Sequence, residues 1–368
     1  MPTKKTRISI VLPTYNECEN IAPLVQRLLK ITESFDLELL IIDDDSSDGT
    51  TSLIKKLAQE ESRIRIIHRV GRAGLASAIK EGLLGATGEI AVVMDSDGQH
   101  DPSRIIDAID LLRKDSLDIV AGSRFLSGSE ILGLSQRRTG GSSIANKLAR
   151  FSLPSKYKHL TDYMSGFIVL NLQFCMQSIY KVDVNGFKFF YELLSISRGE
   201  FNVGEIPLNF LPRNHGSSKL DIAILWDFVI SLIHTSTFRL MPRRAISFGL
   251  VGATGMFVQL TVTQFLMEIF GFEFGRALPV SVVAAATSNY LINNALTFRA
   301  QRQNGKALIK GLLKFLLVAS LPVLANVGLA TSFYRMIAQD PLLAQLAGII
   351  VVFVWNYAAS SRFVWNTP

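Results

Sequence analysis

The side chains best suited to chemistry are two carboxylates and an amide that directly follow an apolar segment. Asp95, Asp97 and Gln99 come after residues 90–94, which read IAVVM. Acidic residues are depleted from strands, so a pair of them at the end of one needs a reason. Alternate residues of an extended chain point the same way, so these three can converge on one hard cation. Because every ligand offered is an oxygen, we expect Mg²⁺ or Mn²⁺.

The first half of the chain alternates between strand-like and helix-like segments. Strands are predicted at residues 8–12, 38–42, 63–68, 90–94 and 117–121, and helices at 19–31, 50–60 and 75–84. A further helix is expected from Asp101, an acidic N-cap, and Pro102 in its first turn. This alternation predicts an α/β fold with a doubly wound, mostly parallel sheet.

Polar clusters stand where these predicted strands end. They are PTYNE at 13–17, DDDSSDG at 43–49, DSD at 95–97 and GSR at 122–124. Ligands of such sheets bind beyond the carboxyl ends of the strands, so we expect these clusters to form one site. The sequence has neither the Gly-x-Gly-x-x-Gly fingerprint nor a P-loop, which disfavours a dehydrogenase or a P-loop ATPase. A diphosphate held through a cation is typical of a nucleotide-sugar transferase.

Four uncharged segments follow, each close to the ~20 residues that a helix needs to cross a bilayer. They are residues 245–267, 277–298, 315–334 and 341–361. They predict an all-α, four-helix transmembrane domain and a multi-pass integral membrane protein. Basic residues gather before the first segment and between the second and third, which places both termini and the first half on the cytoplasmic side. We expect domains at 1–219 and 242–368, joined by a linker at 220–241.

The net charge of +7 over 368 residues is explained by this topology and by contact with anionic lipid. No basic stripe with interleaved aromatic residues occurs in the first half, so we expect no nucleic-acid partner. Two cysteines are too few for a disulfide framework and suit a reducing cytoplasm. The five histidines show no metal-ligand spacing. The first apolar segment is too short for a signal peptide.

Two polar features of the second half have alternative readings. The linker is apolar but interrupted by Asp221 and Asp227, which suits a helix in the membrane interface or one that docks against the sheet. Asparagines 289, 293, 294 and 326 lie inside predicted spans. Such side chains usually bind neighbouring helices, and a lipid headgroup is the alternative.

Together the motifs IVLPTYNE at 10–17, DDDSSDGT at 43–50, DSDGQH at 95–100 and GSR at 122–124 resemble glycosyltransferase family 2. Within that family the chain is most similar to the dolichyl- or polyprenyl-phosphate mannose and glucose synthases, over residues 7–220. FGLVGATG at 248–255 and SNYLINN at 288–294 resemble the GtrA-like four-span membrane domain. The resemblance implies a GT-A type of fold for the first domain.

The resemblance also implies a role for each candidate residue. Nucleotide-sugar binding would involve Pro13, Tyr15, Glu17, Asp43, Asp44, Arg72, Asp95, Ser96, Asp97, Lys188, Arg213 and Lys219. The metal would be held by Asp95, Asp97 and Gln99, and the acceptor phosphate by Arg124 and Arg138. Asp97, Arg124 and Arg213 would be the catalytic residues. Arg72 stands where the family usually has a lysine.

The implied reaction is an inverting, metal-dependent transfer of a hexose from a nucleotide sugar, GDP-mannose by preference, to a polyprenyl or dolichyl monophosphate. The acceptor phosphate is already ionised, so no general base is needed. The cation would stabilise the departing diphosphate, and arginines would hold the phosphates. UDP-glucose as donor, or a non-catalytic lipid-carrier transport or anchoring protein, are the alternatives. A homo-oligomer is compatible with the sequence.

Several of these residues also have a purely structural interpretation. Residues 43–48 could form a turn and helix cap, since Asp and Ser are favoured there. Arg124 could make a surface ion pair. Residues 127–143 read as a Gly/Ser-rich loop, either a flap over the acceptor or a solvated linker. Asp162 could orient an acceptor group or cap a turn.

Overall fold

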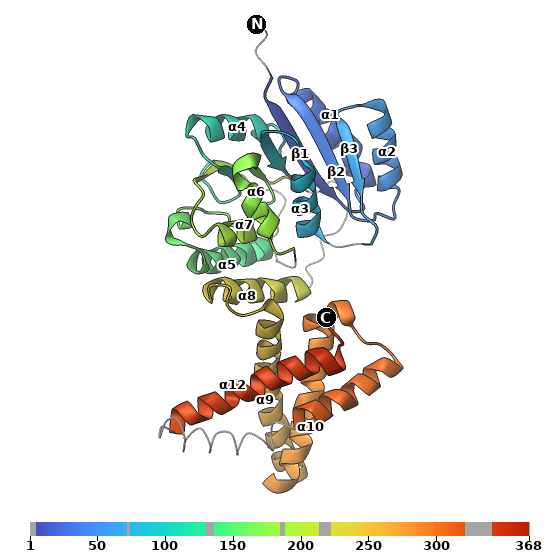
Figure 1. Ribbon diagram of the computed structural model, residues 1–368, viewed down its shortest axis with the longest axis vertical. Coiled ribbons are helices and arrows are strands. Elements are labelled where there is room, and N and C mark those ends of the chain that lie inside the picture. Colours follow the sequence, from blue (N-terminus) through green and yellow to red (C-terminus); the bar gives the residue numbers. More distant parts are fainter. Residues whose placement is uncertain are drawn as a thin grey trace. The chain divides into compact units, whose positions relative to one another are not determined.

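The computed structural model describes residues 5–71, 74–129, 136–184, 188–212, 222–320 and 341–367 (Figure 1). Five of the residues singled out in the sequence lie outside these ranges, namely Arg72, Arg213, Lys219, Asp221 and Asn326, as does the side chain of Arg138. The chain divides into two compact units, residues 1–236 and residues 237–368.

Within the described residues, unit 1 is built on a seven-stranded sheet with the order β3-β2-β1-β4-β6-β5-β7. The strands are β1 (Arg7–Thr14), β2 (Asp36–Asp43), β3 (Ile64–His68), β4 (Ile90–Val93), β5 (Ile119–Ser123), β6 (Ile168–Asn171) and β7 (Val203–Pro207). Among them, β6 runs antiparallel to both of its neighbours, and the other pairs are parallel. The predicted α/β fold with a mostly parallel sheet is confirmed.

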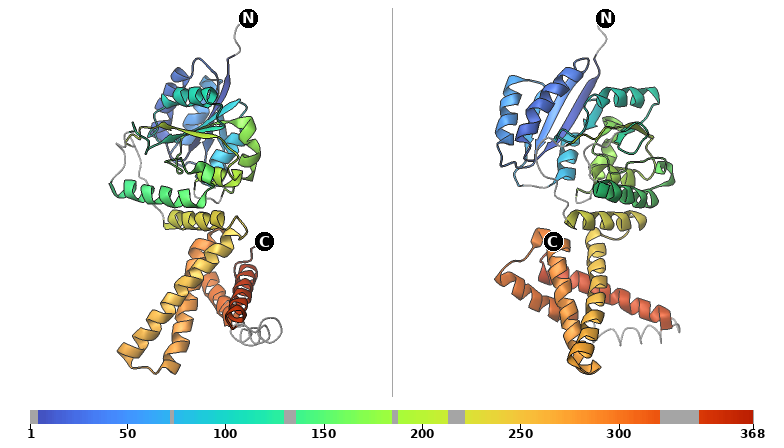
Figure 2. Two further views of the ribbon diagram at one scale, coloured as in Figure 1. Left: turned by 90° about the vertical axis from the view of Figure 1, so that its left-hand side faces the viewer. Right: turned by 180° about the vertical axis from the view of Figure 1, so that it is seen from behind.

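Helices cover both faces of this sheet (Figure 2). One face carries α1 (Cys18–Ile31), α2 (Thr50–Glu60) and α4 (Arg104–Lys114). The other carries α3 (Leu75–Gly85), α5 (Gln136–Ser152), α6 (Leu172–Lys181), α7 (Phe189–Ser197) and α8 (Ile222–Ser236), with a 3₁₀ turn at Ser155–Tyr157. Along β1, Ile10 and Leu12 face the first layer and Val11 the second. Strands buried on both faces are apolar without interruption, which is why the sequence reveals them clearly.

The predicted start of the helix after β4 is wrong by a few residues. Helix α4 begins at Arg104, with Ser103 as its N-cap. Instead of capping a helix, the Asp101 carboxylate accepts hydrogen bonds from the Ser103 backbone N–H (3.1 Å) and hydroxyl (2.8 Å). Asp side chains readily bond the backbone two residues on and so form a turn. That turn precedes the helix and delays its start.

The predicted loop at 127–143 is also wrong in its second half, because α5 begins at Gln136. Ala149 of this helix is fully buried in the core beneath the sheet. Packing of that kind overrides the low helix propensity of the glycines near the helix start.

The predicted linker contains α8, which belongs to unit 1 and packs one side on the rest of that unit. Phe228 is buried in the unit 1 core and meets the ring of Tyr191 edge-on, with the ring centroids 6.5 Å apart. The hydroxyls of Ser195 and Thr235 lie 3.0 Å apart. Leu225, on α8, is more than half exposed. The helix therefore docks on α7, one of the helices that cover the sheet, while keeping exposed apolar surface.

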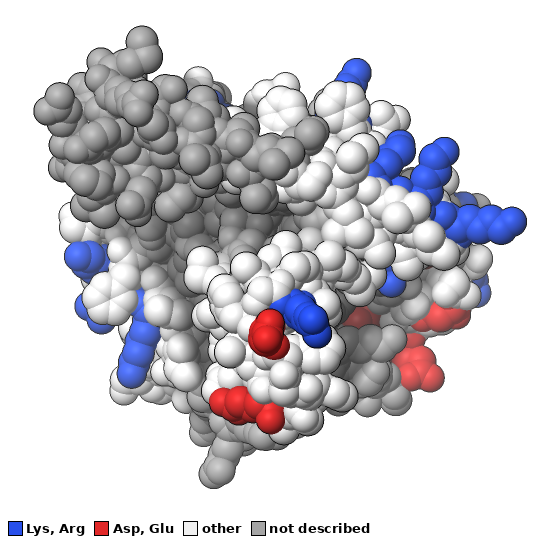
Figure 3. Space-filling view, turned by 90° about the horizontal axis from the view of Figure 1, so that it is seen from below, with Lys and Arg blue, Asp and Glu red and all other residues white. Residues whose placement is uncertain are grey.

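The secondary structure of unit 2 is all helical within its described residues. It contains α9 (Arg243–Phe270), α10 (Phe274–Ile292), a helix at 306–320 and α12 (Pro341–Ala359), with short turns at Asn293–Thr297, Arg299–Gln301 and Ser360–Val364. Among the described helices, α9 alone is long and apolar enough to cross a membrane, and residues 350–364 form a shorter apolar helix. The predicted count of four spans is not confirmed, because α9 alone qualifies among the described helices and most of the third predicted span lies outside the described residues. Uncharged side chains make up most of the described surface in Figure 3.

An aromatic cluster joins the helix ends of unit 2. The rings of Phe298 and Trp365 stack with centroids 4.1 Å apart, and Tyr290 stacks on the same tryptophan at 5.5 Å. The indole N–H of Trp365 donates to the Asn294 side-chain oxygen (3.2 Å). Asn294 also exchanges two hydrogen bonds with the backbone of Gln303. This asparagine therefore has the structural role that the sequence favours for it.

Candidate active site

The polar clusters meet at one edge of the sheet, as predicted. Strands β1, β2 and β4 are parallel and end there. Strand β5 ends at the same edge because it and β4 are both antiparallel to β6, which lies between them. Strand β6 is antiparallel and starts at the same edge, so residues 161–166 approach from it. Strand β7 ends there beside β5, so residues 208–211 also reach the site. In the first of these segments the sequence analysis singled out Asp162 alone, and residues 208–211 were not predicted.

The loop that carries the two carboxylates is held from both sides. The Ser96 hydroxyl donates to the Pro13 carbonyl at the end of β1 (2.9 Å). The Gln99 side-chain amide donates to the Leu211 carbonyl (3.1 Å), and the Leu211 N–H donates back to the Gln99 carbonyl (2.9 Å). Within the loop, the Gln99 N–H donates to the Asp97 carboxylate (3.1 Å). The loop is therefore fixed before any ligand binds.

His100 supports Asp95 from the buried side of this loop. The Asp95 backbone N–H donates to His100 Nδ1 (3.2 Å), and His100 Nε2 lies 3.8 Å from the Asp95 carboxylate. Burial lowers the pKa of His100 below its ordinary value, and the charges of Arg124 and Lys188 lower it too, against the opposing charges of Asp95 and Asp97. His100 is therefore neutral, and the hydrogen bond to Nδ1 assigns its proton to Nε2, facing Asp95.

Gly166 and Lys188 flank the same carboxylate. A Cβ atom on Gly166 would lie 2.7 Å from an oxygen of Asp95, so the absence of a side chain there leaves room for that carboxylate. Asp95, Gly166 and Lys188 line one small pocket, together with Ser165 and apolar side chains of α3 and α7. The structure thus brings the predicted Lys188 to the predicted carboxylate.

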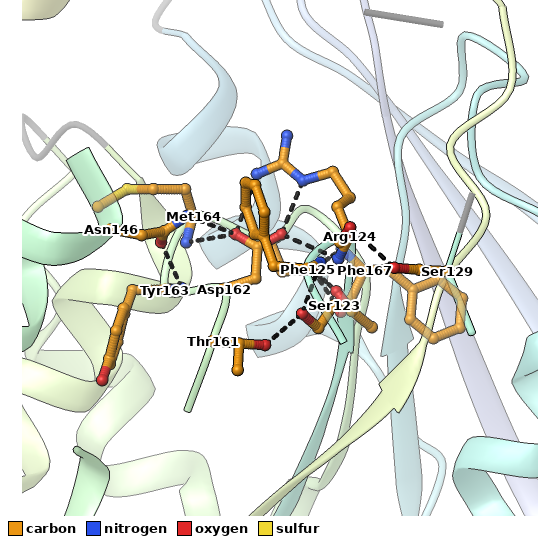
Figure 4. A network of polar contacts seen from close by, with 12 residues as sticks. Ser123, Arg124, Phe125, Ser129, Asn146, Thr161, Asp162, Tyr163, Met164 and Phe167 are labelled. Carbon is orange, nitrogen blue, oxygen red and sulfur yellow. Dashed lines mark hydrogen bonds and ion pairs between the residues drawn. The ribbon is translucent and has the colours of Figure 1, made fainter. Parts of the chain in front are cut away.

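Arg124 is paired with Asp162 inside the protein (Figure 4). Arg124 Nε and one Nη donate to the two carboxylate oxygens at 2.7 and 3.0 Å. The Asp162 side chain is fully buried and that of Arg124 is 15% exposed. Burial opposes the charged guanidinium, but the hydrogen bond and charge of Asp162, aided by Asp95, raise the pKa of Arg124 above its ordinary value. The ion pair is therefore buried, not the surface pair that was the alternative.

A second layer of polar groups fixes Asp162. Glu205 on β7 accepts hydrogen bonds from the backbone N–H groups of Thr161 and Asp162, each at 2.9 Å. Burial raises the pKa of Glu205, and these hydrogen bonds only partly offset that rise. The hydroxyls of Thr161 and Ser123 lie 2.5 Å apart and tie the segment to the end of β5. Arg124 is thus held at a set position, with its third nitrogen pointing away from Asp162 (Figure 4).

Comparison with known proteins assigns both parts of the chain to families. Residues 9–173 match the glycosyl transferase family 2 model, and residues 247–365 match the GtrA/DPMS transmembrane domain. A polyprenol monophosphomannose synthase of Mycolicibacterium smegmatis is 32% identical over 229 residues, which are 60% of this chain and 82% of that protein. The chain belongs to glycosyltransferase family 2.

Two further similarities concern the whole chain. The dolichol-phosphate mannosyltransferase of Pyrococcus furiosus is 28% identical over 364 residues, covering 98% of this chain and 100% of the relative. A mannosyltransferase of Pyrobaculum calidifontis, solved with GDP-Man and Mn²⁺, is 14% identical with a TM-score of 0.46, covering 100% of this chain and 89% of that one. At that level the structural likeness carries no conclusion about ligands.

In this glycosyltransferase the loops after β1 and β2 are bonded to each other. The Asn16 N–H donates to the Ser46 hydroxyl (2.9 Å), and the Glu17 N–H donates to the Thr50 hydroxyl (3.0 Å). Asp43 is fully buried and accepts hydrogen bonds from the hydroxyls of Ser46 and Thr51, both at 2.5 Å. The acidic cluster therefore does organise the turn before α2, as its structural interpretation expects. Tyr15, next to these loops, is 37% exposed.

Asp44 is neutralised by an arginine that the sequence analysis missed. Its carboxylate lies 2.8 Å from Arg69, whose side chain also lies 3.0 Å from Glu81. The Gly74 N–H donates to Asp44 as well (2.8 Å). The sequence signal that could have identified Arg69 is its position directly after β3, at the end of a strand. A ligand that contacts Asp44 would therefore also lie next to the positive charge of Arg69.

The residues at the carboxylate loop fit a divalent cation. Within the described residues, no three of His, Cys, Asp and Glu converge as a metal site. Mg²⁺ commonly takes one or two protein carboxylates and completes its shell with water and substrate phosphates, so Asp95 and Asp97 suffice. The Gln99 amide nitrogen is used by Leu211, which leaves its oxygen for the cation. All three donors are oxygens, as such a cation prefers.

Proposed function

We propose that this glycosyltransferase moves a mannosyl group from GDP-mannose to the phosphate of a polyprenyl or dolichyl monophosphate. The observation that carries the proposal is the similarity to a dolichol-phosphate mannosyltransferase over 98% of this chain, which includes both units. A family 2 domain alone would leave the acceptor open. In this chain the family 2 domain is followed by a match to a transmembrane domain family, and that combination favours an acceptor that resides in the membrane.

The donor would bind at the carboxylate loop with Mg²⁺ or Mn²⁺ held by Asp95, Asp97 and Gln99. The cation supplies Lewis-acid stabilisation of the negative charge on the departing nucleoside diphosphate. Ser96 and Leu211 keep the loop in place through their bonds to Pro13 and Gln99. Because this loop is already formed, it does not have to reorganise as charge develops on the diphosphate in the transition state.

The nucleotide would lie against the bonded loops after β1 and β2. The predicted residues on these two loops are Pro13, Tyr15, Glu17, Asp43 and Asp44, and Arg69, just after β3, pairs with Asp44. Arg72 stays a predicted contributor outside the described residues. Lys188 lines the pocket beside Asp95, where a cation can offset phosphate charge. Arg213 and Lys219 remain predicted contributors to the same phosphates.

The acceptor phosphate would be held by Arg124, with Arg138 as a predicted second contact. Asp162 uses Nε and one Nη of Arg124 and leaves one Nη directed away from the pair (Figure 4). The lipid phosphate is ionised at neutral pH and attacks without a general base, in keeping with a neutral, buried His100. One direct displacement at the anomeric carbon inverts its configuration.

We place this enzyme in the membrane as a multi-pass protein with unit 1 on the cytoplasmic side. The match to a transmembrane domain family and the apolar α9 support membrane insertion. The concentration of basic residues before α9 and after α10 supports the orientation.

The test is transfer of radiolabel to polyprenyl phosphate by the purified full chain, with Mn²⁺ and either GDP-mannose or UDP-glucose. We expect labelled lipid from GDP-mannose, loss of label on chelation, and recovery when Mn²⁺ is restored. Asp97→Ala should abolish transfer, whereas Asp107→Ala, which removes an exposed carboxylate of α4, should not. Label from UDP-glucose instead would replace the proposed donor. Donor binding without transfer or hydrolysis would favour the non-catalytic alternative.

A further inference from the structure

Unit 2 contains a partly open cavity of about 400 Å³ between its helices. It is lined by Phe248, Gly249, Gly252, Ala286, Asn289, Asn293, Phe315, Ala319, Val352, Phe353 and Asn356. These residues come from α9, α10 and the turn after it, the helix at 306–320, and α12. All of them fall within the match to the transmembrane domain family. Its volume is in the range of small-molecule sites.

Three asparagines of this lining have unpaired side-chain oxygens. Oδ1 of Asn289, Asn293 and Asn356 is buried and has no hydrogen-bond partner among the described residues. Asn294, the next residue after Asn293, differs because its side chain makes hydrogen bonds to Gln303 and Trp365. Packing between helices, the interpretation favoured from sequence, accounts for Asn294 and leaves the other three without a role.

A buried carboxamide oxygen without a partner in the protein is costly unless water or a ligand in the cavity supplies the hydrogen bond. Polar side chains that are not used between helices and face a cavity are candidates for ligand binding. The backbone is adapted to them as well. A Cβ atom on Gly255 of α9 would clash with both terminal atoms of the Asn289 carboxamide. Asn293 begins a π-helical turn, a feature often found at functional sites.

The lining indicates the chemistry of the ligand. Unpaired carbonyl oxygens call for hydrogen-bond donors, and the lining contains no Lys, Arg, Asp or Glu, so the bound group should be uncharged. Phe248, Phe315 and Phe353 offer ring surfaces to its apolar faces. A hexose has this combination of hydroxyl donors and C–H faces. A ligand inside a transmembrane unit is most readily supplied from the lipid phase.

We propose that this cavity binds the neutral, polyhydroxylated sugar of a lipid-linked sugar. The identification of this sugar as the mannose transferred by unit 1 rests on the proposed function. The existence of the binding site does not depend on it. Asn289, Asn293 and Asn356 accept hydrogen bonds from its hydroxyl groups, and the three phenylalanines pack against the ring.

The test uses the full chain in lipid nanodiscs and a polyprenyl-phospho-mannose that carries a diazirine on its sugar ring. After irradiation and digestion, mass spectrometry locates the labelled peptides. We expect label in residues 248–256, 286–293 or 350–357, displaced by unlabelled lipid-linked mannose and not by the same concentration of free mannose. Label confined to unit 1 would overturn the proposal, and equal displacement by free mannose would overturn the lipid-linked source.

Two variants make the assignment specific. Asn293→Leu combined with Asn356→Leu should reduce label in unit 2 at least fivefold. Gly252→Leu should do the same by filling the cavity, and it should fold well, because a Cβ atom at Gly252 meets nothing within 4 Å. Gln264→Leu, a change of an exposed polar residue on α9, is the control and should leave labelling unchanged. Undiminished label in both cavity variants would refute the site.

Transfer activity separates this proposal from the proposed function. The cavity variants should transfer mannose within twofold of the unaltered enzyme, because none of the changed residues belongs to the site in unit 1. If the enzyme makes no lipid-linked mannose but the probe still labels the cavity peptides, the site stands and the proposed function fails. If the enzyme makes lipid-linked mannose and the probe labels unit 1 alone, the proposed function stands and the cavity site fails.

Discussion

Replacing Asp162 by alanine should leave the guanidinium of Arg124 buried without its counter-ion. The carboxylate makes two hydrogen bonds to Arg124, at 2.7 and 3.0 Å, and its side chain is fully buried. Removing one partner of a buried ion pair costs about 3–5 kcal/mol, because an uncompensated charge remains. The matched control is Glu60→Ala, which breaks an exposed pair with Lys56. A pair of that kind contributes about 0.3–0.5 kcal/mol.

These energies translate into clearly separate melting temperatures. For a domain of this size, 1 kcal/mol shifts the midpoint by about 2–4 °C, so Asp162→Ala should lower it by roughly 6–20 °C and Glu60→Ala by at most about 2 °C. The assay is thermal unfolding of the full chain in detergent. Trp226 on α8 reports on unit 1 once Trp355 and Trp365, which lie in unit 2, are replaced by phenylalanine.

A double-mutant cycle distinguishes loss of the pair from loss of packing. Arg124→Ala combined with Asp162→Ala removes both charges, so its midpoint should lie above that of Asp162→Ala alone. Both variants should also need more lipid phosphate for half-maximal transfer, since Arg124 is displaced or absent. The reasoning fails if Asp162→Ala melts like the Glu60 control. It fails equally if the double variant loses the sum of the two single losses.

Gly166→Ala brings a methyl group to 2.7 Å from Asp95 and should lower kcat/KM at least about tenfold, whereas Gly85→Ala, which meets ordinary contacts, should not. His100→Ala removes the acceptor of the Asp95 N–H, so a Mn²⁺ titration should show a half-maximal concentration raised about 10–100-fold. Burial raises the pKa of Glu38, but hydrogen bonds from Ser9, Thr87 and Arg65 outweigh it and hold that pKa below 4.5. This stabilisation is present above pH 4.5 and is lost as the pH falls through the folded-state pKa. Glu38→Gln should therefore lower the melting temperature at pH 7, by a margin that shrinks in scans below pH 4.5.

Strands β1, β2, β4 and β5 could be predicted because each is largely apolar and buried on both faces, and β3, at the edge of the sheet, because its isoleucines lie between polar residues. β1 shows this in its alternating contacts to two different helix layers. β6 is only four residues long and enters the sheet antiparallel between β4 and β5. A short apolar segment carries no local signal for which two strands it will pair with in the sheet. The order of the sheet, and with it the approach of residues 161–166, is decided by long-range packing that a local pattern does not record.

The carboxylates and Arg124 could be predicted from their places at strand ends, but their supports could not. Asp162 stands 38 residues beyond Arg124 and reaches it only because β6 begins at the same edge as β5 ends. Glu205 lies on β7, where an acidic residue in a strand is the sole sequence signal. Gly166 becomes meaningful only when the carboxylate of Asp95 is placed against it.

The asparagines of unit 2 show most clearly where residue type stops being informative. Asn293 and Asn294 are neighbours of the same type in an apolar segment, so any pattern that assigns a role to one assigns it to the other. The helix turn separates them, since Asn294 faces Gln303 and Trp365 while Asn293 lines the cavity. A buried amide whose bonds are all made within the protein stabilises the fold, and one whose oxygen is left unpaired beside a cavity is available to a ligand. The functional inference for unit 2 therefore depends on hydrogen-bond partners and not on the polar residues as such.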